Sequence, residues 1–136
     1  MNKINNLDKS DKSDKKALGK FGEEAAAKFL SRRFYKIIAQ NFRKRSFEID
    51  IIAQKGKILC FIEVKTRSSD KFGTPKEAVD FKKQQKIILG AQEYLLQNDW
   101  DGEIRFDVAE VYAHKKNEKF YVDKINYIKN AFDNSF

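Results

Sequence analysis

Two acidic residues and a lysine lie where a folded chain would ordinarily place apolar side chains. Asp50 interrupts the apolar run of residues 49–53, and Glu63 and Lys65 end the apolar run that begins at Ile58. A charged side chain buried in a strand is costly unless it is paired or binds a metal. Residues two apart in a strand share a face, so Glu63 and Lys65 project together. Such a group of two carboxylates and one lysine could hold a divalent cation and act on a phosphate.

The chemistry of this group depends on how the two strands align. If the hairpin closes about Lys55-Gly56 with an even loop, Asp50 is expected opposite Phe61 and diagonal to Glu63, on the same face. A one-residue bulge would break this alignment. The alternative interpretation of so short a pattern is an exposed Glu–Lys pair beside a solvated aspartate.

A hard divalent cation would explain why carboxylates occupy these positions. Mg²⁺ takes oxygen ligands and retains several waters. It polarises a phosphoryl oxygen and lowers the pKa of a bound water. The neighbouring Lys65 could orient that water or stabilise the extra negative charge that develops on the phosphorus centre.

The elements that must position these residues follow from the apolar periodicity. Apolar residues at three- and four-residue spacing predict an amphipathic helix over residues 18–31. Extended segments are expected over residues 36–42 and 46–54, separated by the basic run 43–45. A strand over residues 57–67 is apolar on both faces until its last residues, which is typical of an interior strand covered on both sides.

The second half of the chain predicts one long helix and further strands. Thr74 followed by Pro75 and Glu77 has the composition of a capping box, and the helix that it begins is expected to run to about residue 97. We then expect strands over residues 105–113 and 119–125 and a short final helix over residues 125–132. This order predicts an α/β sandwich around a mixed sheet.

Composition narrows the class of protein. The chain has 136 residues, which is enough for one domain, and its net charge is +8. Residues 1–16 are almost entirely polar and are expected to be disordered. They hold five Lys and three Asp, so a single domain over residues 17–136 keeps about +6 of the charge. A basic domain favours a polyanionic partner such as nucleic acid.

Several kinds of site and location are excluded or disfavoured. Cys60 and His114 are the only residues of their types, which rules out an intramolecular disulfide and any site that needs two histidines. Cys60 lies in an apolar run and is expected to be a small buried side chain. No apolar stretch is long enough to cross a membrane, and the N-terminal residues have no signal-peptide pattern. A cytoplasmic location is expected.

The sequence around the acids and the lysine matches a known pattern. The motifs G-x-x-G-E-x-x-A, EIDIIA, FIEVKTR, A-x-x-YL and RFDV, spread over residues 18–112, resemble those of the YraN family of small bacterial proteins. The acids and lysine also resemble the PD-(D/E)xK nuclease signature, with Glu48-Ile49-Asp50 in place of its proline-containing part. The resemblance implies a restriction-endonuclease-like three-layer sandwich with a central mixed sheet flanked by helices, and Mg²⁺ or Mn²⁺ as the cofactor.

Carried over by position, the resemblance implies roles for four residues. Asp50 and Glu63 would be metal ligands and Lys65 the catalytic lysine. A further acid from the opening helix, as in archaeal Holliday-junction resolvases, would be Glu23 or Glu24. At 100° per residue, Glu23 lies about 110° from the centre of the apolar face and Glu24 about 150°. Glu23 is therefore expected as the third metal ligand and catalytic acid, the alternative being a solvated helix charge.

Seven basic residues are candidates for a nucleic-acid interface. They are Arg43, Lys44, Arg45, Arg67, Lys82, Lys83 and Lys86. Arg67 is expected to clamp a phosphate with its planar fork, and the others to follow the phosphate backbone. The alternative is scattered charge that keeps the protein soluble. Glu48 is expected to support the site or pair with a nearby arginine, and Asp107 to pair with Arg105.

Three functions compete. The first is a Mg²⁺-dependent endonuclease that hydrolyses phosphodiester bonds of DNA, including branched or damaged DNA. The second is a non-catalytic nucleic-acid-binding module on the same fold. The third is a protein-interaction adaptor whose charge serves only solubility. The intact set of Asp50, Glu63 and Lys65 favours the first over the second. The basic domain favours both over the third. No membrane partner is expected, and a homodimer is left open.

Overall fold

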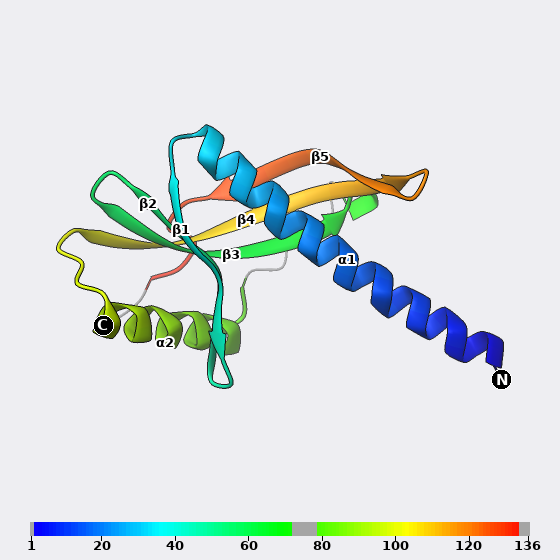
Figure 1. Cartoon of the computed structure of the whole chain (residues 1–136), viewed down its shortest axis with the longest axis horizontal. Coiled ribbons are helices and arrows are strands. Elements are labelled where there is room, and N and C mark those ends of the chain that lie inside the picture. Colours follow the sequence, from blue (N-terminus) through cyan, green and yellow to red (C-terminus); the bar gives the residue numbers. More distant parts are fainter. Residues whose placement is uncertain (1, 72–78, 134–136) are drawn as a thin grey trace.

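A computed structural model describes residues 2–71 and 79–133 of the chain (Figure 1). The helices are α1 (Asn2–Arg32), the short 3-10 helix η1 (Ser69–Lys71) and α2 (Phe81–Gln97). The strands are β1 (Lys36–Lys44), β2 (Phe47–Lys55), β3 (Ile58–Ser68), β4 (Glu103–Lys116) and β5 (Lys119–Ile128). Within the described residues, neither α-helix has an apolar stretch of the length needed to cross a membrane.

The strands form one mixed sheet in the order β1-β2-β3-β4-β5. β1, β2 and β3 pair antiparallel, as do β4 and β5, whereas β3 and β4 are parallel. A parallel pair needs a crossover, and the segment that contains α2 makes it. The prediction of an α/β protein with a mixed sheet is therefore confirmed, with β3 at the centre.

The central strand divides two apolar cores. Leu59 and Phe61 of β3 belong to the core under α2, whereas Cys60 and Ile62 belong to the core under α1. All four are at most 1% exposed. Alternate residues of a strand face opposite sides, so an apolar strand between two helical layers must be apolar at every position. The predictions of an interior strand and of a buried Cys60 are confirmed.

Helix α1 packs against β3 through a glycine. A Cβ added at Gly22 would lie 1.8 Å from Thr66 Oγ1, so only a residue without a side chain allows this approach. The close contact fixes the rotation of α1 over the sheet. It thereby determines which of the next residues in the helix face the strands.

The N-terminal segment from Asn2 is part of the first helix of the structure. Residues 2–16 continue α1, and this part of the helix extends beyond the edge of the sheet (Figure 1). The segment contains no glycine or proline, and Asp8–Lys12 and Asp11–Lys15 have the four-residue spacing that favours a helix. Lys115 Nζ at the β4–β5 hairpin lies 3.3 Å from Asp14 Oδ1.

At the ends of elements, one prediction fails and one lies outside the described residues. The final helix expected over residues 125–132 is absent, because β5 continues to Ile128 and the chain then turns at Asn130, whose φ is 53°. Ile125 and Tyr127 pack in the α1-side core, as alternate residues of a strand do. The predicted helix start at residues 74–77 lies outside the described residues. The described α2 begins at Phe81 and ends at Gln97, the end that the sequence predicts.

Candidate active site

The candidate site lies where β2 and β3 separate. The two strands form a hairpin that closes at Lys55 and Ile58, around Gly56 with φ of 58°. Their last registered pair is Ile51 with Ile62. Ile52, and not Asp50 as expected, lies opposite Phe61, because the loop contains only two residues. If the same register is continued by one residue, Asp50 lies opposite Glu63.

A break in strand alternation turns Asp50 out of the ladder. Ile49 packs in the core under α2, whereas Ile51, only two residues later, packs in the core under α1. In the neighbouring strand β1, Asn41 has a positive φ of 54°. The Val64 backbone N–H donates a hydrogen bond of 2.7 Å to Asp50 Oδ2. The Asp50 side chain thus takes the place of a backbone acceptor and is held beside Glu63.

Two carboxyl groups therefore share a poorly hydrated space. Glu63 is 8% exposed, and its Oε2 has no hydrogen-bond partner among the described residues. Burial, and then the negative charge of Asp50, raise the pKa of Glu63 to about 8. Burial also raises the pKa of Asp50 to about 6, although the Val64 N–H opposes the shift. A buried pair of like charges of this kind is costly unless a proton or a cation compensates it.

The other two residues of the predicted site also lie near the pair. Glu23 is half-buried, and its negative charge contributes to the raised pKa values of both Asp50 and Glu63. Glu24 is exposed and lines a groove between α1 and β5. Lys65 is half-buried, and its positive charge acts to lower the pKa of Glu63. The structure thus brings together the acids and the lysine that the sequence singles out.

A second lysine reaches Glu63 from helix α2. Lys83, in the first turn of α2, forms an ion pair with Glu48, and its Nζ lies 3.7 Å from Glu63 Oε1. Glu48 therefore pairs with a lysine rather than with an arginine. Burial, together with the nearby charges of Lys86 and Arg43, lowers the pKa of Lys83. Residues 48 and 83 are 35 positions apart, and no motif in the sequence joins them.

Two of the remaining basic residues, Arg43 and Lys86, lie close enough to the site for their charges to act on its groups. The β1–β2 turn and the start of α2 lie next to each other (Figure 1), which places Arg43 close enough to influence Asp50 and Lys83. The exposed members of the group are Arg43, Lys44, Arg45, Lys82 and Lys86. The basic run 43–45 does not separate two strands as expected, because β1 includes residues 43 and 44.

Arg67 is already engaged within the protein. Its Nε lies 3.8 Å from Glu110 Oε2, and Glu110 is only 2% exposed. Asn126 donates a hydrogen bond of 2.9 Å to the other oxygen of Glu110. The ion pair to a buried carboxylate was not predicted, because residues 67 and 110 meet only through the parallel pairing of β3 and β4.

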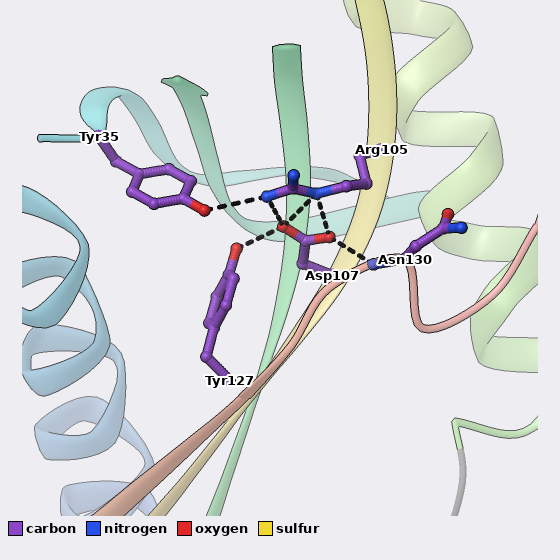
Figure 2. Close-up of polar contacts among 5 residues, drawn as sticks. All are labelled: Tyr35, Arg105, Asp107, Tyr127 and Asn130. Atoms are coloured by element: carbon purple, nitrogen blue, oxygen red, sulfur yellow. Dashed lines mark hydrogen bonds and ion pairs between the residues drawn. The ribbon is translucent and has the colours of Figure 1, made fainter. Parts of the chain in front are cut away.

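A separate buried cluster is satisfied internally (Figure 2). Asp107 is fully buried and receives hydrogen bonds from Arg105 Nε at 2.8 Å, the Tyr127 hydroxyl at 2.5 Å and the Asn130 N–H at 2.9 Å. Arg105 also donates to the Tyr35 hydroxyl at 3.0 Å. The predicted Asp107–Arg105 ion pair is confirmed. The cluster ties the ends of β4 and β5 to the residues after α1.

The donor set fits a metal site with two protein carboxylates. Among the residues that the structure describes, no group of three His, Cys, Asp or Glu side chains is close enough to hold a metal ion. Asp50, Glu63 and Glu23 therefore do not form a complete cage. Mg²⁺, however, typically binds one or two carboxylates and fills its other positions with waters and substrate phosphate. The adjoining carboxyl groups of Asp50 and Glu63, with Glu63 Oε2 unpartnered among the described residues, suit that arrangement.

Fold and site together define a small α/β protein with a carboxylate–lysine cluster at a split between central strands. The chain belongs to the uncharacterised protein family UPF0102, whose sequence profile matches residues 22–111. It is 47% identical over 122 residues to the UPF0102 protein TTE1452 of Caldanaerobacter subterraneus, covering 89% of this chain and 98% of the relative. It is 48% identical over 123 residues to a UPF0102 protein of Acetivibrio thermocellus, covering 89% and 95%. The UPF0102 protein FP2501 of Flavobacterium psychrophilum is 44% identical over 115 residues, covering 85% and 92%. This is the family that the resemblance to YraN proteins indicates.

Proposed function

We propose that this protein is a cytoplasmic, Mg²⁺- or Mn²⁺-dependent nuclease of the PD-(D/E)xK superfamily that hydrolyses phosphodiester bonds of DNA. The observation that carries the proposal is the buried carboxyl pair. The Val64 N–H holds Asp50 beside Glu63, and the pKa of each acid is raised. A fold that places two such acids next to Lys65 has built a costly arrangement, which a bound cation would relieve.

The architecture supports the same proposal. Three antiparallel strands are followed by a crossover through α2 to a parallel strand, and α1 covers the other face. This matches the central mixed sheet flanked by helices that a restriction-endonuclease-like fold requires. The acids and the lysine lie just beyond the last registered pair of β2 and β3, Ile51 with Ile62.

Each residue of the site has a distinct task in this proposal. Asp50 and Glu63 would hold the metal ion, and Glu23 would add negative charge from α1. The bound ion would supply polarisation of a phosphoryl oxygen and a more acidic water. Lys65, beside Glu63, stabilises negative charge as it develops on the phosphate oxygens. Burial around Glu63 keeps bulk water away and strengthens these electrostatic interactions.

The basic residues beside the acids support DNA as the substrate. Arg43 and Lys83 lie at the cluster itself, and the exposed lysines and arginine of the β1–β2 turn and of α2 continue the positive surface. Contacts of this kind to phosphates are independent of sequence and sensitive to salt. Arg67 is the weakest candidate in the interface, because it pairs with buried Glu110.

The test is cleavage of linear, nicked, flapped and four-way DNA by the purified protein with Mg²⁺ or Mn²⁺. Lys65→Ala should lower the turnover by about 10²- to 10³-fold and leave DNA binding nearly intact, because its charge matters most in the transition state. Lys65→Arg should rescue poorly, since a forked guanidinium does not replace a compact ammonium. Glu24→Ala is the matched control for Glu23→Ala, because Glu24 is exposed. Full activity of Lys65→Ala would refute the assigned mechanism.

A nucleic-acid-binding module is the second candidate, and the Lys83 contact favours it. Lys83 already supplies a positive charge to Glu48 and Glu63, so the acids could be neutralised without a metal. Binding of DNA that weakens with salt, without cleavage of any of the four substrates, would support this candidate. Absence of DNA binding would leave a protein-interaction adaptor.

A further inference from the structure

Lys83 places a positive charge against the acids of the candidate site. Its Nζ lies 3.7 Å from Glu63 Oε1, and it also forms an ion pair with Glu48. The Lys83 side chain is 28% exposed and the Glu63 side chain 11%, so the contact is partly shielded from water. An ion pair of this kind is stronger than one on an open surface. Any other cation that binds Glu63 must compete with this ammonium group.

The position of Lys83 is set by the packing of α2. Asp80 caps the helix, and its carboxylate accepts a hydrogen bond of 2.7 Å from the Lys83 backbone N–H. One turn later, Ile87 is buried in the core shared with the sheet. Lys83 therefore faces the strands. Lys86, on the same helix, is exposed and forms no ion pair with Glu48 or Glu63 among the described residues.

We propose that the ammonium group of Lys83 competes with the divalent cation for the carboxylate of Glu63. When the metal binds, the Lys83 ammonium is released and becomes available to the substrate phosphate. This inference rests on the proposed metal-dependent function. In the free protein the ammonium group lies against Glu48 and Glu63. When a divalent ion takes over the charge of Glu63, Lys83 remains close to Glu48 and Arg43, at the edge of the basic surface.

The competition links the binding of metal to the binding of DNA. A DNA phosphate that attracts Lys83 away from Glu63 makes the carboxylate more available to the metal. Because coupling between two ligands is reciprocal, the metal must then strengthen DNA binding by the same factor. Lys83 would thus favour occupation of the site by a metal only when a substrate phosphate is present.

The test is the affinity of the full-length protein for Mn²⁺, measured by calorimetry without DNA. Lys83→Gln should bind Mn²⁺ about tenfold more tightly than the unmodified protein, which is within the usual range for coupled ligands. Lys83→Arg keeps the competing charge and should retain the original affinity. Lys86→Gln removes the same charge from the same helix and should change the affinity by no more than about twofold. Thermal melting of each variant without metal establishes that it is folded.

The outcomes separate this inference from the proposed function. Tighter binding by Lys83→Gln, but not by Lys86→Gln or Lys83→Arg, supports the competition. Equal changes in the two glutamine variants would overturn it and leave a general effect of net charge, while cleavage by the unmodified protein would still support the nuclease. Failure of every variant to bind Mn²⁺ would overturn both the competition and the metal-dependent function.

Discussion

The buried carboxyl pair makes the stability of the metal-free protein depend on pH. Burial, and then Asp50, raise the pKa of Glu63 from 4.5 to about 8. The folded protein therefore holds this proton at pH values where the unfolded chain has lost it. The stabilisation is complete below the unfolded pKa and is lost as the pH rises through the folded pKa. We expect the free energy of unfolding to fall between about pH 4.5 and pH 8.

The size of the effect follows from proton linkage. A single group of this kind changes the free energy of unfolding by at most about 1.4 kcal/mol per pH unit within its window. Asp50, with its pKa raised from 3.8 to about 6, adds to the slope in the lower part of the range. Glu63→Gln has no proton to lose at this position. Between pH 6 and pH 8, the free energy of unfolding of this variant should fall less steeply than that of the unmodified protein, by about 1 kcal/mol per pH unit. The variant should therefore be more stable than the unmodified protein at pH 8.

Urea unfolding with a chelator present, repeated at several pH values, measures these slopes. Glu24→Gln makes the same chemical change at an exposed position and should keep the original slope. Mg²⁺ at about 100 times its dissociation constant should add about 2.7 kcal/mol to the unmodified protein at pH 8. The reasoning is refuted if Glu63→Gln keeps the original slope, or if the unmodified protein is more stable at pH 8 than at pH 6.

Three other substitutions test the packing around the site by urea unfolding. Gly22→Ala should lower the free energy of unfolding by about 1–3 kcal/mol, because the added Cβ would overlap a β3 side chain. Gly19→Ala is the control and should not lower it, because the space around its Cβ is open. Equal effects of the two substitutions would contradict the close packing at Gly22. Tyr127→Phe should lower the free energy of unfolding by about 1–3 kcal/mol, because it removes a hydrogen-bond donor to buried Asp107. An unchanged stability would show that this hydrogen bond does not stabilise the fold. Asp50→Ala should be less stable than Asp50→Asn by about 1 kcal/mol, because only asparagine keeps an acceptor for the β3 backbone N–H.

Local patterns were sufficient for much of this fold. The apolar residues on both faces of β3 predict a central strand, because each face must contact a different helical layer. Helical periodicity places Glu23 toward the sheet and Glu24 in solvent, as the structure has them. These features follow from neighbours within one element, so the sequence alone contains them.

The ends of elements were less predictable, because packing decides them. Residues 125–128 have a composition compatible with a helix, but pairing with β4 keeps them in β5. The polar residues 2–16 continue a helix that is anchored further along the chain, whereas composition alone predicts disorder. A nucleated helix extends at little cost, and that nucleus lies outside the segment itself.

The sequence by itself singled out the residues of the candidate site, because charged side chains at Asp50, Glu63 and Lys65 conflict with the apolar pattern around them. Only the tertiary structure decided how they meet. A break in alternation and a hydrogen bond from β3 hold Asp50 in place, where an unbroken strand would not. Likewise, Lys83 reaches Glu63 only because α2 returns across the sheet. Contacts between distant segments depend on how whole elements pack, and no short-range pattern encodes that packing.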